Sequence, residues 1–256
     1  MMPAVLFIGG MDSSGGAGLL RDCATAAECG VTPRVAVTAV TAQTDRGVLS
    51  VHPVPPEVVA AQIAAAGPVS AVKIGMLCSA RIVSAVCDAL PAVPCVLDPV
   101  VRSSSGHPLI DGDGIGLLLA RLLPRVDLLT PNLPELAVLA GKLGASAQPE
   151  PCQVAALHRA GCRSVLVKGG HATDDTGCED RLYQRGAAVV RFCDTRLPGT
   201  LRGTGCQLAS AIAAGLAQGA PLSEAVTAAR ARVRQRFAET WPCPAGRPGP
   251  RATANR

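Results

Sequence analysis

Aromatic residues are scarce in this chain of 256 residues, which contains three Phe, one Tyr and one Trp. Proteins that bind single-stranded nucleic acid stack its bases on aromatic side chains, so this scarcity argues against that class of partner. The formal net charge of +5 is only a mild basic excess, and we expect no nucleic-acid partner. A mildly basic surface is compatible with anionic small molecules as ligands.

Long apolar runs are missing as well. No uncharged stretch of about 18 or more strongly apolar residues occurs, and no basic segment precedes an apolar stretch with a cleavage site. The 11 cysteines include no C-x-x-C pair, and most lie in apolar or helical contexts. A cysteine there behaves as a small hydrophobic residue, which favours free thiols in a reducing compartment. We therefore expect a cytoplasmic protein that binds no membrane.

Apolar residues make up 48% of the chain and charged residues 17%, which suffices for a full core. Short β-branched runs alternate with longer segments rich in Ala and Leu. The strands that this pattern predicts are 4–8, 34–41, 71–74, 95–97, 126–129 and 165–168. The helices are 15–29, 57–66, 80–90, 112–123, 134–140, 153–160, 207–218 and 222–236. An antiparallel pair of strands is expected at 180–183 and 187–192.

This alternation predicts an α/β fold with a largely parallel sheet that helices cover on both faces. We expect one domain over residues 1–241, followed by a Pro-, Gly- and Arg-rich tail, 242–256, that is typical of disorder. Ligands of such sheets bind beyond the carboxyl ends of the strands. Polar residues lie at or just after those ends at Asp12, Gln43, Lys73, Asp98, Asn132 and Lys168.

A glycine cluster over residues 9–18 follows the first predicted strand and opens a helix. Backbone N–H groups at such a helix start can face an anion or a polar ring. The spacing matches neither the dinucleotide-binding fingerprint nor the Walker A motif, so both interpretations are rejected. The alternative is a tight structural turn, although five glycines together with Asp12 exceed what a turn requires.

Asn132 and Glu135 stand three residues apart at the exit of another strand, next to Pro131 and Pro134. Carboxylate and amide oxygens at this spacing can help to hold a hydrated Mg²⁺. The same spacing also matches a helix capping box, and both interpretations stay open.

The segment Gly203-Thr204-Gly205-Cys206 leads directly into an Ala-rich helix. Consecutive N–H groups of a glycine turn at a helix start form an anion hole that suits a transferring phosphoryl group. The helix dipole is expected to lower the pKa of the Cys206 thiol and to make it a proton acceptor. The alternative for Cys206 is one more buried cysteine.

Lys168 ends a strand in front of Gly169, Gly170 and His171. Only three lysines occur in the chain, and one at this edge of the sheet can meet nucleotide phosphates. The alternative is an exposed lysine in a strand-end turn.

Taken in order, seven segments resemble the hydroxymethylpyrimidine/phosphomethylpyrimidine kinases of thiamine biosynthesis, which have the ribokinase-like fold. They are GGMDSSGGAG (9–18), TAVTAQTDRGV (38–48), KIGML (73–77), LDPV (97–100), LLTPNLPE (128–135), VKGGH (167–171) and GTGC (203–206). The resemblance implies a three-layer α/β/α architecture with a central, mostly parallel sheet. It also implies transfer of the γ-phosphoryl group of ATP, with Mg²⁺, to the hydroxymethyl group of an aminopyrimidine and then to its monophosphate, by a homodimer.

The resemblance also assigns roles to residues. A pyrimidine pocket is implied at Gly10, Ala17, Asp22, Gln43, Met76 and Val100. Mg²⁺ would be organised by Asp98 and Glu135, and the ATP phosphates by Asn132 and Lys168. The anion hole would be Gly203, Thr204 and Gly205, with Cys206 as the base.

The chain departs from the family pattern at three places. The loop after LDPV carries Arg102 and serines in place of the usual Lys, Arg202 stands where a His commonly precedes GTGC, and the Gly/His-rich end is replaced by the tail. The second phosphorylation and the choice of substrate therefore stay open, and either arginine could supply the lost positive charge. The alternatives are a pyridoxal-type kinase and a non-catalytic pyrimidine- or nucleotide-binding protein. The retained Asp98, Glu135 and Lys168 favour a kinase.

Overall fold

The computed structural model describes residues 2–44, 47–103, 106–169 and 178–240. The predicted tail 242–256, Gly170 and His171 therefore lie outside the described residues.

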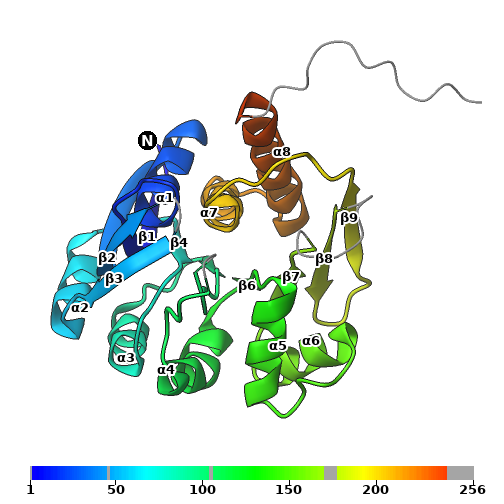
Figure 1. The fold of residues 1–256 in the computed structure, drawn as a ribbon, viewed down its shortest axis with the longest axis horizontal. Helices are drawn as coiled ribbons and strands as arrows, with labels where there is room; N and C mark the ends of the chain where they lie inside the picture. The colour runs from blue at the N-terminus through cyan, green and yellow to red at the C-terminus, as the bar shows by residue number, and fades with distance from the viewer. Residues whose placement is uncertain (1, 45–46, 104–105, 170–177, 241–256) are drawn as a thin grey trace, which may run out of the picture.

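A single twisted sheet runs through the described part of the chain (Figure 1). Its strands stand in the order β3-β2-β1-β4-β5-β6-β7-β8-β9, and neighbours from β2 to β7 are parallel. The strands are β1 (Ala4–Asp12), β2 (Thr32–Thr44), β3 (Gly47–Pro53), β4 (Ala71–Ile74), β5 (Cys95–Leu97), β6 (Leu128–Leu129), β7 (Ser164–Val167), β8 (Cys178–Gln184) and β9 (Val190–Asp194). Antiparallel pairs close both edges, β2–β3 at one side and β7–β8–β9 at the other.

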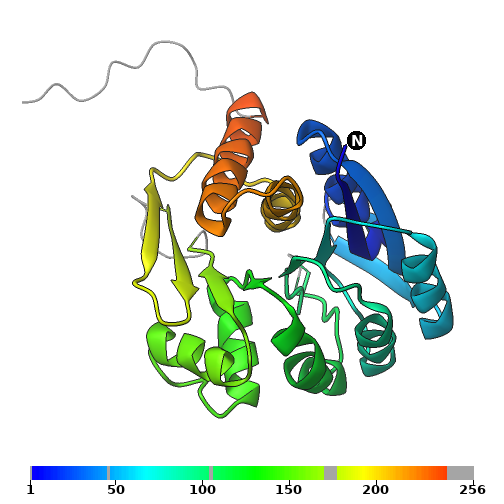
Figure 2. The same ribbon diagram turned by 180° about the vertical axis from the view of Figure 1, so that it is seen from behind.

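Helices cover both faces of this sheet, as Figures 1 and 2 show from opposite sides. One face carries α1 (Gly18–Glu28), α7 (Thr204–Ala217) and α8 (Leu222–Thr240). The other carries α2 (Pro56–Ala65), α3 (Ala80–Ala89), α4 (Gly112–Leu117), α5 (Leu133–Lys142) and α6 (Glu150–Arg159). The predicted three-layer, mostly parallel architecture is confirmed.

The alternation of side chains in the central strand explains the two cores. Leu6 and Ile8 of β1 pack in the core under α2 to α6, whereas Val5 and Phe7 pack in the core under α1, α7 and α8. All four side chains are buried. A continuous apolar run is what a parallel strand needs when helices cover both of its faces.

Three elements differ from the predictions. The antiparallel strand β3 was not expected, because none of its seven residues is buried, and backbone pairing with β2 holds it at the edge of the sheet. The predicted helix 112–123 is α4 continued by a π-helical turn (Leu118–Leu122) and a 3₁₀ turn (Leu123–Arg125). The 3₁₀ turn shortens the following strand, so that β6 holds only Leu128 and Leu129.

The carboxyl ends of β1, β4, β5, β6 and β7 meet at one edge of the sheet, as parallel strands require. A β-bridge between Asn132 and Lys168 continues the pairing beyond the ends of β6 and β7. Most of the predicted functional residues follow these strand ends. No helix within the described residues is both long and apolar enough to cross a membrane.

Candidate active site

The turn before α7 can be formed only by glycine at its first position. Gly203 has a left-handed backbone (φ 73°) and lies against the carbonyl oxygen of Gly16, where a side chain would overlap that oxygen. Gly205 is less restricted, but a Cβ there would lie 3.3 Å from Lys168 Nζ and 3.7 Å from Asp98 Oδ2. The predicted anion-hole residues therefore lie directly beside Lys168 and Asp98.

Asp98 and Lys168 form a close ion pair below this turn. Lys168 Nζ donates to Asp98 Oδ1 at 2.9 Å and stands 3.8 Å from Glu135 Oε2. Burial alone would raise the pKa of Asp98, but Lys168 and Lys73 outweigh it and hold the pKa below its usual value. Burial, opposed by Lys168, raises the pKa of Glu135 to about 6. Lys168 is thus a half-buried cation between two carboxylates rather than an exposed turn residue.

Asn132 and Glu135 form the capping box of α5. The Asn132 side chain accepts from the Glu135 backbone N–H and the Glu135 carboxylate accepts from the Asn132 N–H, both at 2.8 Å. The capping interpretation is therefore confirmed for this pair. The cap also fixes the Glu135 carboxylate in a position that faces Lys168.

The carboxylates of Asp98 and Glu135 fit a magnesium ion only in part. Both are largely buried and share Lys168 as a neighbour. No group of three or more His, Cys, Asp or Glu within the described residues could hold a metal ion. Mg²⁺ commonly rests on one or two carboxylates together with waters and substrate phosphates, and this donor set fits that mode.

Cys206 lies in the first turn of α7, but the predicted fall in its pKa is wrong. Burial raises the pKa of the thiol to about 11, and neighbouring Lys73 and a hydrogen bond with the Gly18 backbone only partly oppose it. Asp22 and Asp98 add to the rise. Desolvation of the thiolate outweighs the helix-terminus effect at this position.

Asp22 lies beneath the site rather than in an open pocket, in contrast to the role implied by the resemblance. Its carboxylate is fully buried and accepts from Lys73 Nζ at 2.9 and 3.0 Å and from Ser210 Oγ at 2.7 Å. Sequence reasoning assigned no role to Lys73 or Ser210. Lys73 carried a signal, because a lysine inside an apolar strand needs a buried partner, whereas nothing in the sequence linked Ser210 to Asp22.

Three of the residues implied for the pyrimidine pocket come together. A Cβ on Gly10 would lie 2.8 Å from Met76 Sδ, so the sulfur covers the Gly10 backbone. Met76 belongs to a small apolar cluster with Ala39 and Leu109, against which Val51, Cys78 and Val100 pack. The resemblance did not assign Ala39 or Leu109 to the pocket.

Ala17 and Gln43 border the same region. The Ala17 N–H donates to Asp12 Oδ2 at 3.0 Å, and Thr41 Oγ1 donates to Gln43 Oε1 at 3.3 Å. Gln43 is also attached through its backbone N–H, which donates to Ser13 Oγ at 2.9 Å. The end of β2 is therefore joined to the glycine-rich loop that follows β1.

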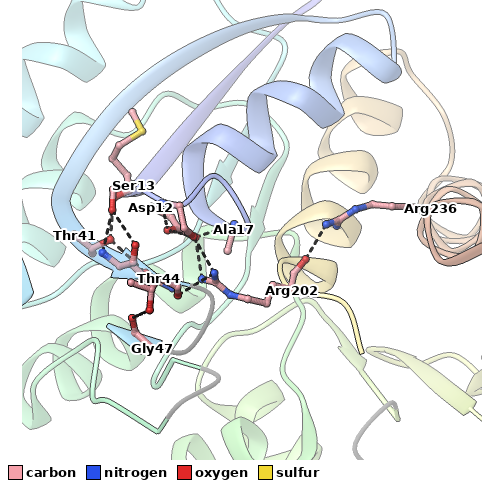
Figure 3. A network of polar contacts seen from close by, with 11 residues as sticks. Asp12, Ser13, Ala17, Thr41, Thr44, Gly47, Arg202 and Arg236 are labelled. Carbon is pink, nitrogen blue, oxygen red and sulfur yellow. Dashed lines mark hydrogen bonds and ion pairs between the residues drawn. The ribbon is translucent and has the colours of Figure 1, made fainter. Parts of the chain in front are cut away.

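Arg202 bridges these segments to the turn before α7 (Figure 3). Its guanidinium donates to Asp12 Oδ2 at 3.0 Å, to Ser14 Oγ at 2.8 Å and to the Thr44 carbonyl at 3.2 Å. The sequence marked Arg202 only as a departure from the family pattern, because its partners lie more than 150 residues away. Arg102, the other candidate cation, lies in a separate loop and donates to the Gly106 carbonyl.

A cavity of about 620 Å³ lies elsewhere, between β9 and α8. Phe192, Leu197, Arg230 and Arg234 are among its lining residues, and no predicted site residue is. The candidate site is therefore defined by the convergence of strand ends, and this cavity is separate from it.

Comparisons with known proteins show which family this chain resembles. The family model described as phosphomethylpyrimidine kinase matches residues 12–249. A hydroxymethylpyrimidine/phosphomethylpyrimidine kinase of Rhizobium meliloti (strain 1021) is 41% identical over 238 residues, which are 90% of this chain and 89% of that protein. A phosphomethylpyrimidine kinase structure from Clostridium difficile 630 superposes with a TM-score of 0.77 at 30% identity and covers 92% of this chain and 99% of its own.

A pyridoxal kinase from Staphylococcus aureus, solved with AMP-PCP and pyridoxal, is also similar. It has a TM-score of 0.80 at 30% identity, over 91% of this chain and 87% of its own. The fold is therefore shared by two kinds of vitamin kinase. Since the family model and the curated relative span most of the sequence, this chain belongs to the phosphomethylpyrimidine kinase family.

Proposed function

We propose that this protein transfers the γ-phosphoryl group of ATP to the hydroxymethyl group of 4-amino-5-hydroxymethyl-2-methylpyrimidine, and in a second round to the resulting monophosphate. Family membership supports the reaction class. The observation that carries the assignment is the position of Gly205 in the turn 203–205: a Cβ placed on it would lie 3.3 Å from Lys168 Nζ and 3.7 Å from Asp98 Oδ2.

The phosphate side of the reaction rests on positioning and charge. Phosphoryl transfer needs alignment of its reactants and neutralisation of negative charge more than covalent help from the protein. Lys168 and the amides of Gly203–Gly205 would hold the transferring group, and Asn132 would border the ATP phosphates. Asp98 and Glu135 would hold Mg²⁺, which when bound neutralises charge on the phosphate oxygens.

The acceptor side holds the pyrimidine and removes a proton. Met76, Val100 and the Gly10 backbone would cover the ring, Ala17 would border it, and Gln43 would hydrogen-bond its polar edge. Cys206 Sγ, as the thiolate, would accept the hydroxyl proton while the acceptor oxygen bonds to phosphorus and the bond to the ADP oxygen breaks. Asp22, through Lys73, would stand behind Cys206 rather than touch the ring.

The pyridoxal alternative is weaker. The similarity to a pyridoxal kinase structure carries 30% identity, whereas the curated pyrimidine kinase carries 41% over the same share of the chain. A non-catalytic relative is also disfavoured, because the ion pair of Asp98 and Lys168 and the glycine turn are intact.

Release of ADP tests the assignment. Purified protein with Mg-ATP is expected to turn over the pyrimidine alcohol and its monophosphate, and to turn over pyridoxal at least tenfold more slowly. No turnover of either pyrimidine would overturn the proposal, and turnover of pyridoxal alone would select the alternative. In the same assay, Cys206→Ala should lower kcat by about 10²–10⁴-fold if the thiolate is the base. Unchanged turnover would leave Cys206 with a packing role.

The homodimer and the cytoplasmic location expected from the resemblance belong to the same proposal. Light scattering of the purified chain measures the first, and fractionation of cells measures the second.

A further inference from the structure

Arg202 has an unusual place between the two halves of the candidate site. It directly precedes Gly203, the first residue of the phosphate-side turn, while its guanidinium reaches the loop after β1 and the end of β2. These are the segments that carry the acceptor-side residues Ala17 and Gln43. One side chain therefore connects both sides of the reaction (Figure 3).

The carboxylate that receives Arg202 organises the acceptor loop. Asp12 Oδ1 accepts from the N–H and the hydroxyl of Ser14 at 2.9 and 2.8 Å, and Oδ2 accepts from the Ala17 N–H at 3.0 Å. The Asp12 side chain is 5% exposed and that of Arg202 is 20% exposed, so their ion pair is partly shielded from water. Ion pairs of this kind fix geometry better than exposed ones do.

The backbone at Arg202 is held from the opposite direction. Arg236 of α8 donates to the Arg202 carbonyl at 3.0 Å and to Gln207 Oε1 at 3.2 Å. The left-handed conformation of Gly203 leaves the following turn little freedom, since Gly16 packs against it. The backbone at residues 202 and 203 is therefore held by contacts other than those of the Arg202 guanidinium.

We propose that Arg202 is a positioning residue that joins loop 12–18 and the end of β2 to the turn 203–205, and so fixes the distance between the acceptor hydroxyl and the transferring phosphoryl group. The planar fork of arginine suits this role, because it serves several acceptors at once in fixed directions. Lysine would keep the charge without that fork. The expected effect on catalysis rests on the proposed kinase function, whereas the hydrogen-bonded connection between these segments does not.

The matched control is Arg121. It donates to Asp88 at 2.7 Å and to Ser84 Oγ at 2.8 Å, so it has the same kinds of partner as Arg202 but lies on the opposite face of the sheet, away from the site. Both substitutions remove an arginine that binds a carboxylate and a serine hydroxyl, although the side chains of the Arg121 pair are more exposed (44% and 65%) than those of the Arg202 pair (20% and 5%), and only Arg202→Ala removes the bridge.

Hydrogen exchange of the intact protein tests the connection without any substrate. Peptides that cover residues 12–18 and 41–44 should exchange faster in Arg202→Ala than in the wild type and stay unchanged in Arg121→Ala. Equal exchange in all three proteins overturns the proposal. This measurement is decisive even if the wild type proves to phosphorylate no pyrimidine.

Steady-state kinetics test the expected effect of Arg202 on catalysis. A displacement of about 1 Å can lower a rate about 100-fold. We expect kcat/KM for the pyrimidine alcohol to fall roughly 10–100-fold in Arg202→Ala, while KM for ATP changes less than twofold. Low millimolar guanidinium should restore part of the lost kcat/KM in Arg202→Ala and have no such effect on Arg121→Ala. The variant Arg202→Lys should recover less than half of the lost kcat/KM.

Two kinetic results would contradict the positioning role of Arg202 in catalysis. Equal kinetics of Arg202→Ala and Arg121→Ala, with an active wild type, would remove the positioning role. A loss confined to the monophosphate substrate, with normal turnover of the alcohol, would show instead that Arg202 contacts the acceptor phosphate directly.

Discussion

At the scale of single residues, burial decides the chemistry more than position in a helix does. Cys206 occupies the helix start that the sequence predicted, yet desolvation raises its pKa to about 11. Lys73 is fully buried and its ion pair with Asp22 is equally hidden from solvent. Neither fact follows from spacing along the chain, because both depend on what the tertiary fold places around the group.

The raised thiol pKa predicts a specific pH dependence. Below a pKa of about 11 the thiol keeps its proton, so the thiolate fraction increases about tenfold for each pH unit above neutrality. If the thiolate is the base, kcat should rise with pH along that slope, and Cys206→Ala should abolish the slope. Lys73, Asp22 and Asp98 are the charged groups around the sulfur.

Alkylation checks the same pKa without substrate. Iodoacetamide should modify Cys206 at pH 8 at least about tenfold more slowly than the exposed Cys152, because only the thiolate reacts. Peptide mass spectrometry after timed quenching gives both rates in one sample. Equal rates would contradict the high pKa.

The buried pair of Lys73 and Asp22 predicts a large effect on stability. Lys73→Met leaves a buried carboxylate with no cation, so the free energy of unfolding should fall by about 3–5 kcal/mol. Loss of the exposed pair in Arg121→Ala should lower it by no more than about 1 kcal/mol. Urea unfolding measures both. In the double variant Lys73→Met/Asp22→Leu, the loss should be smaller than the sum of the single losses.

At the scale of elements, pattern predicts the buried strands and helices and misses the half-exposed edge strand β3, which is held by backbone pairing and by the packing of Val51 against the cluster around Met76. The run from Ala4 to Ile8 has a buried face on each side and was identified correctly. Strand β3 has none and was missed. The glycine turn before α7 was predicted to form an anion hole, but the approach of Gly16 that demands glycine at 203 comes from a segment far away in the sequence.

The turn before α7 predicts a difference between two glycines of that helix. Gly203 and Gly219 both have positive φ, but only Gly203 lies against another backbone, whereas a Cβ on Gly219 would meet nothing within 4 Å. In Gly219→Ala the free energy of unfolding should fall only by roughly 1–2 kcal/mol, which is the cost of a left-handed Ala, and the activity should be unchanged. In Gly203→Ala the free energy of unfolding should fall further, and kcat should fall at least tenfold. Urea unfolding and the ADP assay check both, and equal effects would contradict the steric argument.

At the scale of the whole molecule, one sheet gathers residues from both ends of the sequence. The α/β class, the parallel sheet and the position of the site beyond its strand ends were all predictable from alternation and motif order. The links between distant segments were not, such as those of Arg202 with Asp12 or Ser210 with Asp22. They depend on the strand order and on the packing of α7, and no pattern in the sequence indicates either of these.

Binding of a nucleotide across this sheet should stabilise it as one unit. A non-hydrolysable ATP analogue with Mg²⁺, at about 100 times its Kd, is expected to add about 2.7 kcal/mol to the free energy of unfolding. Thermal unfolding should stay a single transition that moves upward. Lys168→Met should weaken the shift, because it removes a cation that lies against Gly205. An unchanged melting temperature of the wild type would contradict nucleotide binding there.

The direction in which the chain adds strands to the sheet reverses at β1. Its neighbours in the sheet are β2 on one side and β4 on the other. The helix after β1 packs on one face of the sheet and the helix after β4 on the opposite face. The two connecting loops therefore leave in opposite directions, and connectivity alone opens a crevice between them. If Met76 and Gln43 border the substrate as proposed, substitutions at these two positions would change which heteroaromatic alcohol binds, whereas the crevice follows from the topology alone.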